Sequence, residues 1–203
     1  MLNFKDFLKI TKNIIKKEFF WDEVSQSFYK IIKSYIKKDD KILEFGSASG
    51  HISYRLAKEG HIVTLLDIRK NEIKVAQNIF KKNNVRATFI CRDIFNEFGN
   101  YDIAWDSGLI QCLPDEQKEK LIEKISSISK KMILFYPDIR DPHKIRGTNQ
   151  NSIPGVGNAL EYDIEKIPEI TKKYFHHIST GKLEAVEIKM NYGMYWIYAS
   201  NEL

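Results

Sequence analysis

Between residues 41 and 137, short apolar segments alternate with segments whose apolar residues recur at helical spacing. The apolar segments read KILEFG, HIVTLLD, RATFICRD, YDIAWDSG and KMILFYP, and the clearest helical patterns are KNEIKVAQNIFKK and PDEQKEKLIEKISSIS. The strands are apolar enough to be buried on both faces. Repeated alternation of this kind predicts a doubly wound, mostly parallel α/β sheet with helices on both sides.

The segments on either side of this alternation complete the expected fold. Residues 3 to about 38 carry two helical patterns separated by FFWDEVS, which predicts two N-terminal helices. Two strand patterns at about 178–190 and 193–200 are close enough in sequence to form an antiparallel hairpin. We therefore expect one Rossmann-like domain over residues 1–203 with seven strands.

Composition narrows the possible partners. The net charge of +5 could suggest nucleic acid, but the basic residues are mostly lysines scattered along the whole chain, so a nucleic-acid partner is disfavoured. No apolar run approaches the ~20 residues of a membrane span, and the lysine-rich N-terminus lacks a signal-peptide pattern. A basic amphipathic N-terminal helix could lie on a membrane, but packing on its own domain is the favoured interpretation. We expect a cytoplasmic protein, and the oligomeric state stays open.

The two cysteines, Cys91 and Cys112, have neither metal-ligand spacing nor a disulfide framework. Both have apolar sequence neighbours, so we expect buried, reduced thiols and no metal site.

The stretch ILEFGSASGHIS contains an acid and two glycines at the end of a strand, where a ligand is expected in an open α/β sheet. Gly46 and Gly50 allow the backbone to approach a ligand closely. Asp67 lies about twenty residues beyond the turn, at a place where an acid can bind ribose hydroxyls. The acids at or near strand ends are Glu44, Asp67, Asp93 and Asp106.

Two common nucleotide sites do not match this turn. A dinucleotide turn needs G-x-G-x-x-G, whereas Ala48 and His51 occupy its second and third glycine positions here. A phosphate loop ending in G-K-[ST] is absent from the sequence. The pattern therefore favours a nucleoside whose other end is not a phosphate chain.

Four ordered segments, LEFGSASG, LLDIRKNEIKVAQ, CRDIF and YDIAWDSGLIQCLPDEQ, resemble the class I S-adenosylmethionine-dependent methyltransferases over residues 40 to 137. The family turn has a third glycine where this chain has Ala48. The resemblance implies S-adenosyl-L-methionine as cofactor and methyl transfer as the reaction. The resemblance covers the cofactor-binding core at 40–137. The segments outside the strand–helix alternation are expected to cover the exposed face of the cofactor, so we divide the rest into a helical lid at 1–38, a substrate loop at 138–158, and the C-terminal helix and hairpin at 159–203.

The resemblance also implies residue roles. Asp67 would bind the ribose hydroxyls, and Ile68 would lie on the adenine. Asp93 and Ile94 would bound the adenine. The methionyl part would lie among Glu44, Gly46, Ser47 and Gly50, and the sulfonium end would face Asp106, Ser107 and Gly108. The alternative for each acid is a helix cap or a surface turn.

The acceptor is expected to be a small molecule. Amino methyltransferases of nucleic acids carry [DNS]-P-P-[YF] after the fourth strand, whereas DSGLIQ followed by LPD resembles the small-molecule branch. Alternatives are RNA or protein methylation, cofactor binding without methylation, and other chemistry at the sulfonium. The candidate acceptor residues are Trp21, Tyr29, Arg146 and Tyr195. His143 is the candidate general base, and the alternative is a surface histidine.

Overall fold

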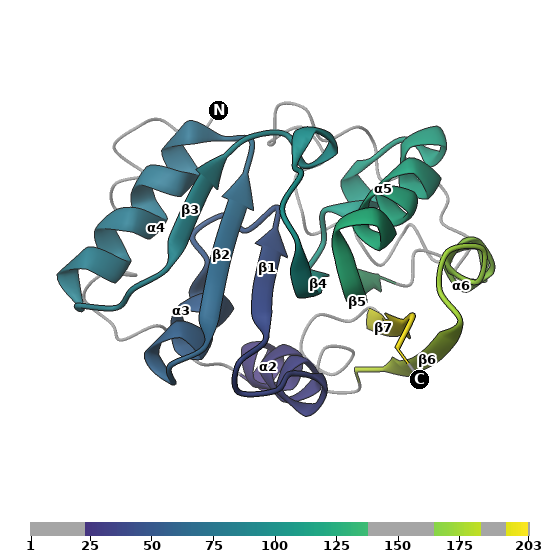
Figure 1. Cartoon of the computed structure of the whole chain (residues 1–203), viewed down its shortest axis with the longest axis horizontal. Helices are drawn as coiled ribbons and strands as arrows, with labels where there is room; N and C mark the ends of the chain where they lie inside the picture. Colours follow the sequence, from purple (N-terminus) through teal and green to yellow (C-terminus); the bar gives the residue numbers. More distant parts are fainter. Residues whose placement is uncertain (1–22, 138–164, 184–193, 203) are drawn as a thin grey trace.

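The computed structural model describes residues 23–137, 165–183 and 194–202 and is built on one seven-stranded sheet (Figure 1). The strand order is β3-β2-β1-β4-β5-β7-β6. Neighbouring strands from β3 to β5 pair in parallel, whereas β7 is antiparallel to both β5 and β6. The strands are β1 (Lys41–Phe45), β2 (Ile62–Asp67), β3 (Thr88–Cys91), β4 (Tyr101–Asp106), β5 (Ser129–Pro137), β6 (His177–Lys182) and β7 (Met194–Ser200). The predicted doubly wound fold is confirmed; the turn of the expected hairpin lies outside the described residues.

The helices follow the predicted alternation. They are α2 (Glu23–Tyr35), α3 (His51–Lys58), α4 (Lys70–Lys82), α5 (Asp115–Ile128) and α6 (Lys166–Thr171), with short 3-10 helices η1 (Ile94–Asn96) and η2 (Ile110–Cys112). In α4 the buried residues are Ile73, Ala76, Ile79 and Phe80, which share one side of the helix. Within the described ranges no helix is both long and apolar enough to cross a membrane.

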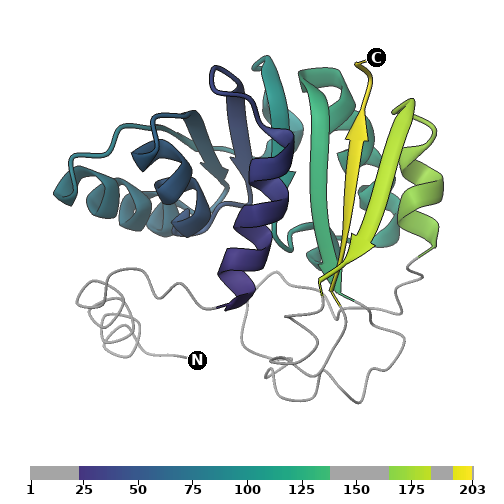
Figure 2. The ribbon, with the colours of Figure 1, turned by 90° about the horizontal axis from the view of Figure 1, so that it is seen from below.

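The helices cover both faces of the sheet, as Figures 1 and 2 show. Residues of α2, α3 and α4 pack against one face, and residues of α5 and α6 pack against the other. Strand β4 contributes to the core on each face. Ile103 and Trp105 pack with residues of α2, α3 and α4, whereas Ala104 packs with residues of α5 and α6. Successive side chains of a strand point to opposite faces, so a continuous apolar run fills two cores at once.

The edge strand β3 departs from the sequence prediction. We expected its residues to be buried on both faces, but they are exposed or half-buried, because among the described strands β3 pairs with β2 alone. Cys91 at its end is exposed and Cys112 is half-buried, so the prediction of two buried thiols was wrong. Apolar neighbours in sequence do not ensure burial at the edge of a sheet.

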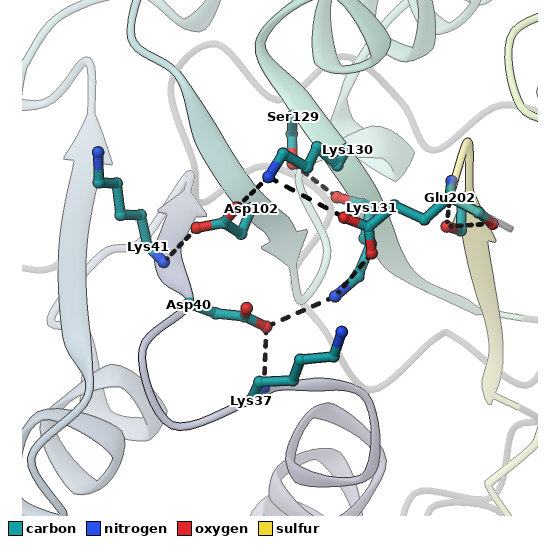
Figure 3. Close-up of polar contacts among 9 residues, drawn as sticks. Lys37, Asp40, Lys41, Asp102, Ser129, Lys130, Lys131 and Glu202 are labelled. Carbon is teal, nitrogen blue, oxygen red and sulfur yellow. Dashed lines mark hydrogen bonds and ion pairs between the residues drawn. The ribbon is translucent and has the colours of Figure 1, made fainter.

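Five charged side chains form a network at the amino ends of the central strands (Figure 3). Lys131 is almost fully buried, with its Nζ 3.6 Å from Asp40 Oδ2 and 3.3 Å from Glu202 Oε2. Lys130 Nζ lies 2.7 Å from Asp102 Oδ1. The network joins the turn before β1, the starts of β4 and β5, and the end of the described chain.

Two of these acids also bind backbone groups. The N–H of Lys37 donates to Asp40 Oδ2 over 2.8 Å, and the N–H of Lys41 donates to Asp102 Oδ2 over 2.9 Å. The connection between α2 and β1 is therefore held to β4 through Asp102 and to β5 through Lys131, close to the point where α2 ends.

Candidate binding site at the carboxyl ends of the strands

Three buried carboxyl groups lie at the carboxyl ends of adjacent parallel strands. Glu44 of β1, Asp67 of β2 and Asp106 of β4 are 5%, 2% and 1% exposed. Strand β1 pairs with both β2 and β4, so the chain reverses its direction of travel across the sheet at this point. Such a switch point leaves a crevice at the carboxyl ends of the strands, and the predicted acids do meet there.

The turn after β1 is attached to β2 by two backbone donors. The N–H of Ser47 donates to the carbonyl oxygen of Leu66 over 3.0 Å, and the N–H of Ala48 donates to Asp67 Oδ2 over 2.9 Å. Gly46, Ala48 and Gly50 all have left-handed backbone, with φ of 64°, 46° and 66°. Ala48 therefore adopts a conformation in which an L-residue is strained by ~1–2 kcal/mol.

The two glycines are required by the protein's own packing. A Cβ atom on Gly50 would lie 1.9 Å from Leu65 Cδ2, and one on Gly46 would lie 3.0 Å from Leu109 Cβ. The sequence suggested room for a ligand as their purpose. The structure adds that a side chain at position 50 would displace the buried Leu65 side chain of β2.

Glu44 combines a buried carboxyl with unsatisfied hydrogen-bonding capacity. Burial raises its pKa to about 8; the Ser53 hydroxyl opposes this increase, and the charges of Asp106 and Asp67 add to it. Among the described residues, neither Glu44 Oε2 nor the buried Ser47 Oγ has a hydrogen-bond partner. Buried polar atoms are normally satisfied, so this corner suits a ligand that brings N–H donors and positive charge.

Asp67 is already fully bonded. Its Oδ1 accepts from the backbone N–H and the Nε of Arg69, over 2.9 and 3.0 Å. Its Oδ2 accepts from Ala48 N–H and from Arg69 Nη2 over 3.0 Å. Burial alone would raise the pKa of Asp67, but the hydrogen bonds from Arg69 and Ala48 outweigh it and keep the pKa below its usual range.

Asp106 organises the turn that follows β4. Its carboxylate accepts the N–H groups of Gly108, of Leu109 over 2.5 Å and of Ile110 over 3.4 Å. Burial nevertheless raises the pKa of Asp106 to about 7, because these bonds offset the loss of solvation incompletely. The carboxyl group thus holds the Ser107–Gly108 turn in place beside the crevice.

The predicted adenine residues differ in their surroundings. Asp93 Oδ1 accepts the N–H of Phe95 over 3.0 Å and caps η1. Ile94 is 5% exposed and packs in the core, whereas Ile68 is 65% exposed at the end of β2. The cap that the sequence offered as an alternative for Asp93 is present, and a ligand contact by these three residues stays a prediction.

Of the predicted acceptor residues, the structure describes Tyr29 and Tyr195; Trp21, His143 and Arg146 lie outside its described residues. Tyr195 on β7 stacks on Tyr136 of β5, with ring centroids 6.2 Å apart, near the carboxyl end of β5.

Tyr29 lies elsewhere. Its hydroxyl donates to Glu59, which follows α3 at the amino-end side of the sheet, and the Arg55 guanidinium lies 3.9 Å over its ring. The structure thus gives Tyr29 a packing role between α2 and α3, and substrate contact by Tyr29 stays a prediction that this position does not favour.

Arg69 is a site residue that the sequence pattern did not predict, and it binds the candidate ribose acid through both its backbone and its side chain. The signal was an arginine two residues after that acid, within reach of a bidentate pair. In the part of the chain that the structure describes, no group of three or more His, Cys, Asp or Glu side chains could hold a metal ion.

Comparisons with known proteins bear on this site. A family model described as a methyltransferase domain matches residues 36–185. A carboxy-S-adenosyl-L-methionine synthase of Nautilia profundicola is 29% identical over 143 residues, covering 58% of this chain and 59% of that protein. A phosphoethanolamine N-methyltransferase of Triticum aestivum is 36% identical over 105 residues, covering 47% of this chain and 20% of that protein. The chain thus spans less than two thirds of the length of these relatives.

Solved structures show the same fold. Magnesium protoporphyrin IX methyltransferase from Synechocystis with bound SAM superposes with a TM-score of 0.69 and 17% identity, over 98% of this chain and 85% of that one. The PH0226 protein from Pyrococcus horikoshii superposes with a TM-score of 0.72 and 17% identity, over 98% of this chain and 100% of that one. Because the methyltransferase-domain model matches residues 36–185, well over half of the sequence, and the fold agrees with it, the chain belongs to the methyltransferase-domain family.

Proposed function

We propose that this chain binds S-adenosyl-L-methionine at the carboxyl ends of β1, β2 and β4 and transfers its methyl group to a small-molecule acceptor. The observation that carries the proposal is the glycine turn bonded to Asp67 through Ala48 N–H, directly beside the unsatisfied carboxyl of Glu44. This arrangement brings a close-approach backbone, a candidate ribose acid and a buried acid together at the carboxyl ends of adjacent strands.

The strand-end residues offer chemistry that suits each part of the cofactor. Glu44 Oε2 and Ser47 Oγ are buried acceptors without partners among the described residues, and they suit the methionyl ammonium group. Asp67 would accept the ribose hydroxyls, and the exposed Ile68 would cover the adenine. The adenine would also meet Asp93 and Ile94. Gly46, Gly50, Ser107 and Gly108 would supply backbone around the methionyl and sulfonium groups.

The protein's task in such a reaction is positioning. The bound cofactor supplies an electrophilic methyl group on a sulfonium. The acids would hold its polar ends, and the turn after β1 and the Asp106-bonded loop would supply backbone contacts to it. Correct alignment of two reactants can contribute ~7–11 kcal/mol to lowering a barrier. A general base is needed only for acceptors that must lose a proton, and His143 is the proposed residue for that step.

A small-molecule acceptor is supported by sequence and by relatives. DSGLIQ stands where nucleic-acid amino methyltransferases carry [DNS]-P-P-[YF]. A relative from Coxiella burnetii, 31% identical over 84 residues, is a ubiquinone biosynthesis O-methyltransferase. Tyr195, beside Tyr136 at the end of β5, would border the acceptor together with Trp21 and Arg146. A cytoplasmic location is part of the same proposal.

One observation favours a second candidate. The carboxy-S-adenosyl-L-methionine synthase relative is named for a reaction that modifies the cofactor itself. A different reaction at the sulfonium would use the same cofactor-binding residues. It would differ in the second substrate, which would not be a methyl acceptor.

The test has two stages. S-adenosylhomocysteine should raise the melting temperature of the purified protein clearly, by linkage, and NAD should raise it little. Next, the protein is incubated with cofactor carrying a deuterated methyl group and with fractionated metabolites, and products are identified by mass spectrometry. Label in an acceptor supports methyl transfer, whereas a modified cofactor that keeps its label supports the second candidate. Stabilisation by NAD and not by S-adenosylhomocysteine would refute both.

A further inference from the structure

The candidate ribose acid is occupied by a side chain of the protein itself. Arg69 binds both oxygens of Asp67, with Nε 3.0 Å from Oδ1 and Nη2 3.0 Å from Oδ2. Backbone N–H groups of Arg69 and Ala48 supply one further donor to each oxygen. A carboxylate offers about four lone-pair sites, so Asp67 has no acceptor capacity left for a ribose diol.

The four donors differ in mobility. The two backbone N–H groups belong to the turn after β1 and to the start of α4, so the fold holds them in place. The guanidinium ends a long side chain that is 49% exposed, whereas Asp67 is 3% exposed. A ligand that approaches Asp67 from the crevice can therefore displace the guanidinium without moving the backbone.

A second acid is ready to receive the displaced side chain. Arg69 Nη1 lies 3.7 Å from Glu72 Oε1, one helical turn further along α4. Rotation about the outer bonds of Arg69 would exchange the Asp67 pair for a closer pair with Glu72. Both positions keep the guanidinium beside a carboxylate, which limits the free-energy difference between them.

We propose that Arg69 is an internal competitor for the cofactor's ribose, which holds Asp67 in the free protein and turns to Glu72 when ligand enters. This inference rests on the proposed function, because it takes Asp67 as the ribose-binding acid. The methylated and demethylated forms of the cofactor share their ribose, so Arg69 weakens both equally. Its consequence for turnover is easier release of the demethylated product.

The decisive measurement is calorimetric titration of S-adenosylhomocysteine into the full chain at pH 8. Arg69→Met keeps the aliphatic stem and removes the competing donors, so it should tighten binding by up to ~5-fold, the upper end of what an ion pair with an exposed partner is worth. Arg69→Lys keeps the charge and loses the two-pronged geometry, so its affinity for S-adenosylhomocysteine should lie between those of the wild-type protein and Arg69→Met. Circular dichroism confirms that each variant is folded.

The chain offers a matched control for charge. Arg92 Nη1 pairs with Glu97 Oε2 over 3.1 Å, and their side chains are 49% and 5% exposed, close to the values for Arg69 and Asp67. Arg92→Met removes the same charge from a similar pair and should leave affinity unchanged. A 2′,3′-dideoxy analogue of S-adenosylhomocysteine isolates the diol, since Arg69→Met should not tighten its binding.

Glu72 provides an independent test of the alternative position. Glu72→Gln should weaken binding of S-adenosylhomocysteine in the wild-type background and have no effect in the Arg69→Met background, because the two residues are coupled. Wild-type protein that fails to bind S-adenosylhomocysteine would overturn the proposed function and this inference together. Wild-type binding that Asp67→Asn weakens but Arg69→Met leaves unchanged or weaker would overturn the competitor alone.

Discussion

The backbone N–H of Ala48 donates to Asp67 Oδ2 over 2.9 Å and joins the turn after β1 to the end of β2. The bond makes one carboxylate serve two purposes, because Asp67 fixes the glycine turn and is also the candidate acceptor for ribose. Removal of the Asp67 carboxylate is therefore expected to disturb the position of the turn as well as ligand contacts.

Asp67→Asn tests this double role. The amide keeps one acceptor oxygen for Ala48 N–H but loses charge and one acceptor, so S-adenosylhomocysteine binding should weaken by ~2–3 kcal/mol. Calorimetric titration measures the change. Asp102→Asn, at the opposite end of the strands, serves as the control and should leave affinity unchanged. Equal affinity in folded Asp67→Asn would remove this residue from the cofactor site.

Ala48→Gly should stabilise the protein slightly. Ala48 has φ of 46°, where an L-residue is strained by ~1–2 kcal/mol. The greater conformational entropy of glycine in the unfolded chain opposes this by ~0.4–1 kcal/mol, so the free energy of unfolding should rise only slightly. Urea unfolding measures the free energy of unfolding, and a loss of stability would show that the alanine methyl group packs usefully in this turn.

Gly50→Ala should destabilise the protein far more than Gly60→Ala. Both glycines have positive φ, at 66° and 91°, so the backbone strain is shared. A Cβ on Gly50 would lie 1.9 Å from Leu65 Cδ2, whereas a Cβ on Gly60 would meet nothing within 4 Å. Overpacking adds ~1–3 kcal/mol at Gly50. Similar unfolding midpoints for the two variants would contradict this account of the turn.

The pH dependence of the site follows from two buried acids. Burial raises the pKa of Glu44 to about 8 and that of Asp106 to about 7. Between their ordinary pKa values and these raised ones, the folded protein holds protons that the unfolded chain has released. The free energy of unfolding of the ligand-free protein should therefore fall as pH rises from about 5 to 8.

A cationic ligand favours ionised Glu44, so cofactor binding should release protons at pH 7 and tighten toward pH 8. Titration in buffers of different ionisation enthalpy measures the released protons. Glu44→Gln should remove most of this proton release. Proton uptake, or none in the wild-type protein, would show that Glu44 does not face the ligand's charge.

The charge network of Figure 3 predicts unequal effects for two adjacent lysines. The Lys131 side chain is 6% exposed and pairs with Asp40 and Glu202. Lys131→Met leaves Asp40 buried without its partner and should destabilise the protein by ~2 kcal/mol, a value below that of a fully buried pair because Glu202 is partly solvated. Lys130→Met, at an exposed position, should change thermal stability little. Equal losses of stability in the two variants would show that burial does not determine the contribution of these lysines.

Sequence alone determined the architecture and the strand-end positions of the candidate site acids. Hydrophobic periodicity is a local property, so it predicted the helices and the strand alternation well. It also placed Glu44, Asp67 and Asp106 at strand ends, and parallel strands bring their carboxyl ends to one edge of a sheet. The meeting of these three acids was therefore predictable without coordinates.

Tertiary structure decided the surroundings of each group. The occupation of Asp67 by Arg69, the unsatisfied Oε2 of Glu44 and the exposure of Cys91 follow from which segments become neighbours in space. The packing of Tyr29 against Glu59 is of the same kind. Burial, pKa and hydrogen-bond satisfaction depend on distances between atoms from distant parts of the chain, and a sequence pattern does not contain those distances.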